Sequence, residues 1–272
     1  MIRVMKINSK DNSLLRQARA VRDGKDNDLI FVEGLRLCEE ALRSGLPLDA
    51  VIVSEELAQK EKASALLKEL TGKAKRSASV SEKLLESISF TKTPQGIVIL
   101  ARRPASHKEI LNSIQPDTAL IVVMHRLNNP VNVGAILRTA EAAGATGVVA
   151  TKETTDPFSP KSLRGAMGSA FRLPIWHDPT YADAIAWCKS KGLQAICAEL
   201  HATQNYDEVD WKQPSALILG PESQGLSAEE VALASTAVKI PMKGQAESLN
   251  VAVAAGVLLY EAARQRSDVA GK

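Results

Sequence analysis

Five polar residues in the second half of the chain have types and positions suited to binding a polar ligand. They are Asn132, Arg138, Glu222, Ser248 and Asn250. Their side chains offer hydrogen-bond donors, acceptors and charge. They lie in or near three loops that each follow a predicted strand. In a parallel sheet such loops meet at one edge, where ligands bind, so the pattern predicts that all five face one pocket.

Each of these residues also has a purely structural interpretation. Asn132 is placed to cap a following helix, and Ser248 or Asn250 to cap another. Glu222 fits a turn, and Arg138 fits a solvated surface. Taken singly, the structural interpretation is favoured. Their joint occurrence at three strand ends favours a site, and Arg138 lies in a helix otherwise made of small and apolar residues.

The glycine patterns argue against the common nucleotide-binding loops. No GxGxxG sequence occurs, so the dinucleotide fingerprint is absent. Residues 220–227 read GPESQGLS, which imitates the glycine spacing of a phosphate-binding loop. Leu226 stands where that loop needs its lysine. We therefore do not expect nucleoside triphosphate binding.

Alternating strands and helices are predicted to position the five residues. A buried strand at 119–124, a helix at 133–143 and a strand at 147–150 form a βαβ unit, which makes the sheet parallel. Segment 151–172 is long, polar and rich in glycine. Ser227 and Glu230 form a capping box. Further elements are a helix at 181–191 and strands at 193–198, 216–219 and 236–240. The last helix is apolar on every face over 251–259, which predicts that it is buried all round.

The first half has its own alternation. Strands are expected at 29–33, 48–53, 78–80 and 96–100, with helices at 12–23, 35–44, 55–70 and 81–87. The segment 101–117 has prolines, charge and little strand propensity, and we interpret it as a connection with one short helix. The fold class is α/β throughout, with a small α/β/α sandwich at 1–104, a linker at 105–117 and a parallel-sheet domain at 118–272.

Composition limits the classes of function. The chain has 272 residues, 45% of them hydrophobic, and a net charge of +3, which permits a nucleic-acid partner without requiring one. Cys38, Cys188 and Cys197 show no spacing typical of zinc or disulfides, so we expect free thiols in a reducing cytoplasm and no metal. We expect no cleaved leader and no membrane span.

Three longer segments carry a family resemblance. Residues 128–140 (NNPVNVGAILRTA), 219–227 (LGPESQGLS) and 240–254 (IPMKGQAESLNVAVA) resemble, in order and spacing, the three signatures of SpoU (TrmH-type) RNA methyltransferases. The resemblance covers about 118–264. The first half is similar, more weakly, to the accessory RNA-binding domain of this family, which is related to small ribosomal proteins. Its matching pieces are residues 31–34 with the following helix and residues 93–97.

The resemblance implies properties that composition and periodicity do not give. It implies a deep trefoil knot in the second domain, a homodimer whose active site is completed across the interface, and methyl transfer from S-adenosylmethionine to a ribose 2′-hydroxyl of RNA. Gly220, Ile240 and Leu249 match positions that contact S-adenosylmethionine, largely through the backbone.

The resemblance also implies roles for the five polar residues. Arg138 matches the family arginine that is proposed to accept or share the proton of the hydroxyl. Because a guanidinium stays protonated, we expect it instead to engage the target phosphate and hydroxyl and to stabilise the developing oxyanion. Asn132 orients Arg138 or the ribose, Glu222 positions the site or a cation, and Ser248 and Asn250 shape the cofactor and ribose pocket. Arg16 and Arg19, on the basic first helix, and Arg164 are weaker candidates for contact with RNA.

Three other functions remain open at this stage. An RNA-binding or ribosome-assembly protein with the same fold would bind RNA without methyl transfer, although the complete motif set counts against it. A metabolic α/β enzyme would need the missing glycine fingerprint. A base-methylating relative is disfavoured by the Asn-x5-Arg and Ser-x-Asn arrangement. Ribosomal RNA is preferred over transfer RNA as the substrate, by analogy with the ribosomal-protein-like domain.

Overall fold

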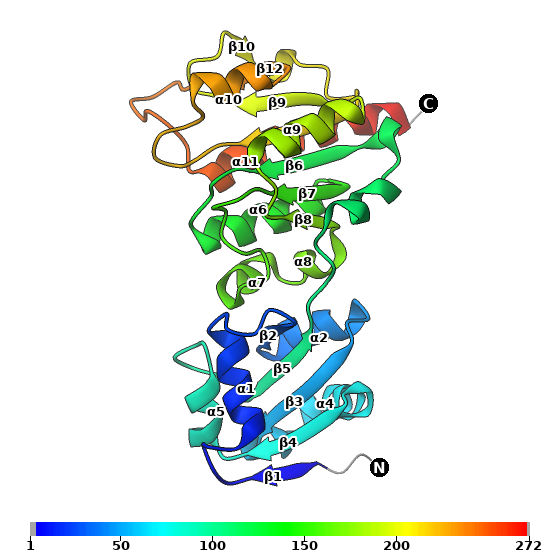
Figure 1. The fold of residues 1–272 in the computed structure, drawn as a ribbon, viewed down its shortest axis with the longest axis vertical. Coiled ribbons are helices and arrows are strands. Elements are labelled where there is room, and N and C mark those ends of the chain that lie inside the picture. Colours follow the sequence, from blue (N-terminus) through cyan, green and yellow to red (C-terminus); the bar gives the residue numbers. More distant parts are fainter. Residues whose placement is uncertain (1–3, 271–272) are drawn as a thin grey trace. The chain divides into compact units, whose positions relative to one another are not determined.

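A computed structural model describes residues 4–270 of the chain, which fold into two compact units (Figure 1). The first unit contains the residues up to Pro104 together with Phe158–Arg172. The second contains Ala105–Pro157 and the residues from Leu173 onward. The sequence predicted a linker with one short helix at 105–117 and a second domain at 118–272. In the structure the supposed linker belongs to the second unit, where Leu111 is buried in the core.

The first unit is built on a mixed five-stranded sheet in the order β1-β4-β3-β5-β2. Strands β1, β3 and β4 run parallel, and β5 runs antiparallel to both β3 and β2. Apolar residues of α1 and α5 pack together with the sheet in one core. The strands are β1 (Met5–Ile7), β2 (Leu29–Glu33), β3 (Leu48–Ser54), β4 (Arg76–Val80) and β5 (Ile97–Arg102). The helices are α1 (Ser13–Arg22), α2 (Leu35–Arg43), α3 (Glu55–Ala58), α4 (Glu61–Lys73) and α5 (Glu82–Ile88).

Segment 158–172 joins this unit through specific contacts. It forms two short helices, α7 (Pro160–Ala166) and α8 (Ser169–Arg172). The guanidinium of Arg103 lies 4.8 Å from the ring centre of Phe158, and Arg172 forms an ion pair with Glu40 of α2. The sequence of segment 151–172 showed only that it is long, polar and rich in glycine. Its two helices are too short to show the apolar period that predicts a helix.

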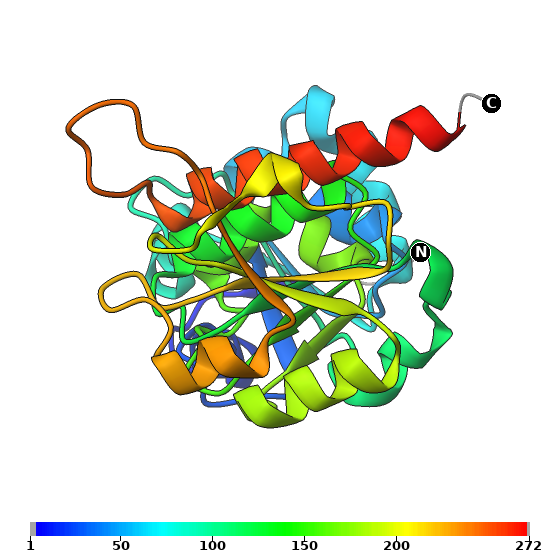
Figure 2. The same cartoon turned by 90° about the horizontal axis from the view of Figure 1, so that it is seen from above.

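The second unit is built on a seven-stranded sheet in the order β10-β12-β9-β11-β6-β7-β8, in which all neighbouring strands are parallel. Figure 2 shows α6 and α11 on one side of this sheet and α9 and α10 on the other. The strands are β6 (Leu120–Met124), β7 (Gly147–Ala150), β8 (Ile175–His177), β9 (Gln194–Ala198), β10 (Gln204–Asn205), β11 (Ser215–Leu219) and β12 (Thr236–Lys239). The helices are α6 (Pro130–Ala142), α9 (Tyr181–Ser190), α10 (Ala228–Leu233) and α11 (Val251–Ala270), with 3-10 turns η1 (Lys108–Ser113), η2 (Pro116–Thr118) and η3 (Tyr206–Glu208).

Helix α11 is not buried all round, contrary to the prediction. Ala255, Leu258, Leu259 and Ala262 are fully buried, at a spacing that places them on one face. Tyr260 is 56% exposed, and Val253 on the opposite side is also exposed. The small residues allow close approach to α6, which covers one face of the helix. Val253 and Tyr260 are left exposed in the single chain, and the remaining apolar positions of 251–257 are mostly partly buried.

Candidate functional site

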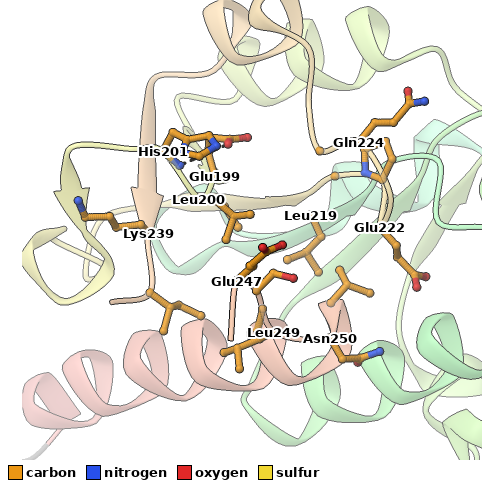
Figure 3. A pocket seen from close by; sticks show the side chains of 18 of the residues that line it. Glu199, Leu200, His201, Leu219, Glu222, Gln224, Lys239, Glu247, Leu249 and Asn250 are labelled. Atoms are coloured by element: carbon orange, nitrogen blue, oxygen red, sulfur yellow. Dashed lines mark hydrogen bonds between the residues drawn. The ribbon is translucent and has the colours of Figure 1, made fainter. Parts of the chain in front are cut away.

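A cavity of about 550 Å³ opens at the carboxyl ends of β9, β11 and β12 (Figure 3). The sheet order places these three strands side by side, so the loops that follow them share one edge. Six of the residues expected from the sequence line this cavity: Gly220, Glu222, Ile240, Ser248, Leu249 and Asn250. The cavity therefore brings together the second and third signature segments.

The loop after β11 is shaped by a close backbone approach. A Cβ atom on Gly220 would lie 2.8 Å from Cγ of Leu226 and 3.3 Å from the Leu226 backbone nitrogen. Only glycine therefore fits without displacing Leu226, which is buried. The loop then enters α10 through the predicted capping box, in which Ser227 and Glu230 satisfy each other's backbone N–H groups.

The third loop ends in Asn250, which has two roles. Its Oδ1 accepts a hydrogen bond from the backbone of Ala252 at 2.9 Å, so the predicted capping interpretation is confirmed. Its Nδ2 donates to Oδ1 of Asn132 at 3.2 Å. The buried Asn132 does not cap α6, because Asn129 does so through the backbone of Val131. The Nδ2 atom of Asn132 is buried and has no hydrogen-bond partner among the described residues.

Two members of the predicted group, Asn132 and Arg138, do not line the cavity of their own chain. Asn132 is linked to the cavity by its hydrogen bond with Asn250. Arg138 is placed differently. It lies on α6 and is exposed. Six positions separate it from Asn132, which turns its side chain about 240° around the helix axis. A single chain therefore brings Glu222, Ser248, Asn250 and Asn132 together and leaves Arg138 outside.

The residues that follow β9 form one wall of the cavity, and the sequence did not predict them. Glu199, Leu200 and His201 line it there, facing the loop after β11 and residues 247–250 (Figure 3). Leu200 is 53% exposed and Leu249 is 36% exposed, so the cavity offers apolar surface to a ligand. The sequence does show Glu199, Leu200 and His201 directly after a predicted strand, which could have marked them as candidates. They reach the cavity only because β9 lies between β11 and β12, and the sequence does not reveal that order.

The charge of the cavity favours a cationic ligand. The carboxylates of Glu199, Glu222 and Glu247 line it, whereas Lys239 is the one Lys or Arg side chain among the described residues of its lining. In Figure 3 the Lys239 side chain extends away from the group formed by Glu199, Leu200 and Glu247. Apolar walls combined with excess negative charge suit a ligand with an aromatic ring and positive groups.

The arginines proposed for RNA contact lie in the first unit. Arg16 on α1 and Arg164 on α7 are exposed. Arg19 is half-buried and donates from Nη2 to the carbonyl of Lys10 at 2.7 Å. Arg22, on the same basic face, donates to the carbonyls of Ile88 and Ser89. The basic face of α1 thus partly serves to hold the fold, and Arg16 is its most available cation.

Two features typical of other classes of protein are absent from residues 4–270. None of the helices there combines the length and the apolar character that crossing a membrane requires. The same residues contain no group of three or more His, Cys, Asp or Glu side chains arranged to hold a metal ion.

Comparison with known proteins agrees with this geometry. Residues 119–260 match the model of the SpoU rRNA Methylase family, and residues 31–106 match that of the RNA 2'-O ribose methyltransferase substrate binding domain. The 23S rRNA (guanosine(2553)-2'-O)-methyltransferase RlmP of Bacillus subtilis is 32% identical, over 85% of this chain and 86% of its own. The tRNA (guanosine(18)-2'-O)-methyltransferase of Escherichia coli is 37% identical, over 59% of this chain and 69% of its own.

A solved structure extends the agreement to the whole fold. The AdoMet-bound rRNA methyltransferase from Sinorhizobium meliloti has a TM-score of 0.83 with this chain and 32% sequence identity, covering 96% of this chain and 98% of its own. The match spans the substrate-binding unit as well as the parallel-sheet unit that holds the cavity. By its signature segments, its fold and its relatives, the chain belongs to the SpoU rRNA Methylase family.

Proposed function

We propose that this chain transfers a methyl group from S-adenosylmethionine to a ribose 2′-hydroxyl of ribosomal RNA. The observation that carries the proposal is the cavity at the ends of β9, β11 and β12, with the Asn132–Asn250 pair at its edge. The Bacillus subtilis relative, a 23S rRNA 2'-O-methyltransferase that matches over 85% of this chain, supports the same reaction.

The residues of the cavity fit S-adenosylmethionine. The cofactor carries an adenine ring, a positive sulfonium and a positive ammonium. Leu200 and Leu249 provide apolar surface for the ring, and Glu199 and Glu247 provide negative charge. Gly220 and Ile240 offer backbone groups at the strand ends. When bound, the cofactor supplies an electrophilic methyl group, and the chain's task is to position a nucleophilic oxygen against it.

The Asn132–Asn250 pair is placed to orient the ribose. The Nδ2 of the buried Asn132 is a donor without a partner among residues 4–270, and such groups are costly unless a ligand satisfies them. We assign that ligand as an oxygen of the target nucleotide. Ser248 and Glu222, both exposed at the cavity, would contact the same nucleotide or fix its approach.

Arg138 would act in the site of a second copy of the chain. A guanidinium beside the 2′-oxygen stabilises the negative charge that develops on it, yet Arg138 does not line its own cavity. Exposed apolar side chains of α6 and α11, Val131, Val253 and Tyr260, offer a surface for a homodimer. Dimerisation through these helices would bring Arg138 of one subunit to the cavity of the other.

We also propose the trefoil knot that the family resemblance implies, with the segment after β12 passed through the preceding chain. The packing of α11 against α6 and the joint lining of one cavity by residues 220–225 and 240–250 support it. An experimental structure whose chain path, closed through its termini, is unknotted would contradict it.

Ribosomal RNA is preferred over transfer RNA as the substrate because the rRNA-modifying relative matches a larger share of this chain than the tRNA-modifying relative. The rRNA-modifying relative matches over 85% of this chain, and the tRNA-modifying relative over 59%. Residues 31–106, which match the substrate-binding model, would select the RNA. Arg16 and Arg164 are proposed as contacts to the RNA backbone.

The test is transfer of labelled methyl from S-adenosylmethionine to ribosomal and transfer RNA, with nuclease mapping of the product. Wild type is compared with Arg138→Ala and with Lys189→Ala, which removes an exposed cation of α9, outside residues 31–106 and outside the cavity. Label in a 2′-O-methyl nucleotide of ribosomal RNA, lost only in Arg138→Ala, is expected. Label on a base, or cofactor binding without transfer to any RNA, would overturn the proposal in favour of base methylation or a binding-only protein.

A further inference from the structure

A polar cluster outside the cavity connects two of the loops that form the site. Its centre is the carboxylate of Glu230, the fourth residue of the α10 capping box, whose side chain is 19% exposed. The backbone of Ser227 donates to Oε2 at 2.9 Å. From the segment after β6, His125 Nε2 lies 3.0 Å from Oε1, and Arg126 Nη2 donates to both oxygens at 2.9 and 3.0 Å.

His125 is fixed on every side. Its backbone N–H donates to the carbonyl of Leu219, the last residue of β11, at 2.9 Å. Nδ1 lies 2.8 Å from the hydroxyl of Thr151, and the ring centre is 4.5 Å from that of Tyr181. The Tyr181 hydroxyl donates to the backbone carbonyl of Glu230 at 3.0 Å. We assign the Nε2 proton to the bond with Glu230, because a carboxylate only accepts.

Arg126 is held in a conformation that costs free energy. Its φ of 51° lies in the left-handed region, which a residue with a Cβ atom rarely adopts. Its Nε atom is buried without a hydrogen-bond partner among the described residues. Strained residues of this kind persist where the surrounding structure requires them, and they concentrate near functional sites. The contact that offsets the cost here is the two-oxygen bond to Glu230.

We propose that Glu230 is a positioning residue for methyl transfer. One carboxylate fixes the end of the loop 220–227, which lines the cofactor cavity, to the segment 125–129, which leads into Asn132. It thereby sets the distance between the group that orients the ribose and the walls that hold the methyl donor. This inference rests on the proposed function, because it concerns the relative placement of the two reactants.

Glu230→Gln keeps the shape of the side chain and removes the charge that binds His125 and Arg126. Because small misplacements of reacting groups slow a reaction strongly, kcat is expected to fall by about 10- to 100-fold. The KM for S-adenosylmethionine should change less, since the cavity walls remain. The matched control is Glu229→Gln, the exposed neighbour on the same helix, which should keep the wild-type kcat.

A second variant separates positioning from stability. Arg126→Gly removes the bond between Arg126 and Glu230 and leaves the bond between His125 and Glu230. Glycine adopts the left-handed conformation of this residue without strain. The expected result is a lowered kcat with a thermal unfolding midpoint at or above that of the wild type. Combining it with Glu230→Gln should lower kcat little beyond Glu230→Gln alone, because that change already weakens the bond to Arg126.

The outcomes are distinguishable. A wild-type kcat in Arg126→Gly would overturn the positioning role. So would a double variant in which the fold-losses of kcat of the two single variants multiply. A kcat that falls only in proportion to the fraction of unfolded protein would also overturn it. A wild-type protein that transfers no methyl to any RNA would instead contradict the proposed function.

Discussion

The side-chain amide of Asn250 donates to the side-chain carbonyl of Asn132, 3.2 Å away, although 118 positions separate the two residues. The bond joins the start of α11 to the first turns of α6 and so connects the first and third signature segments. The bond also sets the orientation of the Asn132 amide. Because Asn132 Oδ1 accepts from Asn250, the Nδ2 atom of Asn132 must point away from Asn250. The pair therefore acts as a unit, with one residue positioning the other.

Replacement of Asn250 should separate its capping role from its role toward Asn132. Asn250→Ser keeps a good cap, so the free energy of unfolding should stay within a few tenths of a kcal/mol, whereas Asn250→Ala should cost about 1 kcal/mol. Both lose the bond to Asn132, so both should lower kcat by about tenfold, as expected for the loss of one hydrogen bond. Denaturant unfolding and methyl-transfer kinetics measure the two effects. Wild-type kcat in the serine variant would contradict the role of the pair.

Gly220 offers a test of the cofactor cavity. In Gly220→Ala the new methyl group would lie 2.8 Å from Leu226, and displacing a buried side chain typically costs about 1–3 kcal/mol. We expect weaker binding of S-adenosylmethionine by about tenfold or more, measured by calorimetry. Gly244→Ala is the matched control, because a Cβ atom there meets nothing within 4 Å. Equal affinities in the two variants would show that the close approach at Gly220 does not shape the cavity.

The sequence predicted the elements of the fold where local signals were strong. The bounds of β2 and β7 and the capping box at Ser227 and Glu230 are as predicted. Short strands such as β1, β8 and β10 were missed, since two or three residues carry no periodicity. The predicted helix at 55–70 is divided into α3 and α4 at Gln59 and Lys60. The sequence has no proline or glycine there that would predict a break.

The site was only partly readable for a different reason. Glu222, Ser248 and Asn250 were found because they lie in segments with recognisable signatures. Glu199 and Leu200 were missed because they line the cavity only if β9 lies beside β11 and β12. The order of strands in the sheet is set by long-range packing. The exposed side of α11 was misread because an apolar helix face looks the same in sequence whether its own chain or another covers it.

The stability of the fold should depend on pH through His125. Burial lowers the pKa of this imidazole below 6.5, and the hydrogen bond and charge of Glu230 only partly oppose the shift. Arg126 lowers it further, and Glu153 acts in the opposite direction. Below pH 6.5 the unfolded chain therefore binds a proton that the folded chain excludes. The free energy of unfolding should fall, by at most about 1.4 kcal/mol per pH unit, until the folded-state pKa is reached.

Denaturant unfolding between pH 7.5 and 5.5 measures this dependence. In His125→Gln the slope should become shallower than in the wild type. Burial raises the pKa of Glu230, but its bonds to Ser227 and His125 outweigh that effect and the net shift is downward. Its stabilising contribution is therefore complete above pH 4.5 and is lost at lower pH. An unchanged slope in His125→Gln would show that the imidazole titrates equally in both states.

The dimer proposal predicts a specific effect at Tyr260, which is 56% exposed on α11. A lysine there would place a charge in an apolar interface, so Tyr260→Lys should be monomeric in sedimentation experiments. Its affinity for S-adenosylmethionine should stay within about twofold, because one chain forms the cavity, while methyl transfer should fall by about 100-fold without the partner's Arg138. Leu233→Lys, at an exposed leucine of α10, is the matched control and should remain dimeric and active.

Mixing two inactive variants tests whether Arg138 crosses the interface. A heterodimer of Arg138→Ala and Asn132→Ala chains would contain one site with both residues intact, if each site takes Asn132 from one subunit and Arg138 from the other. Random mixing makes half of the dimers heterodimers, so the mixture should recover about a quarter of the wild-type activity. If both residues served the same subunit, one chain of each heterodimer would lack Arg138 and the other would lack Asn132. The mixture would then be no more active than its two parents, and Arg138 would have to reach its own cavity by a movement of α6.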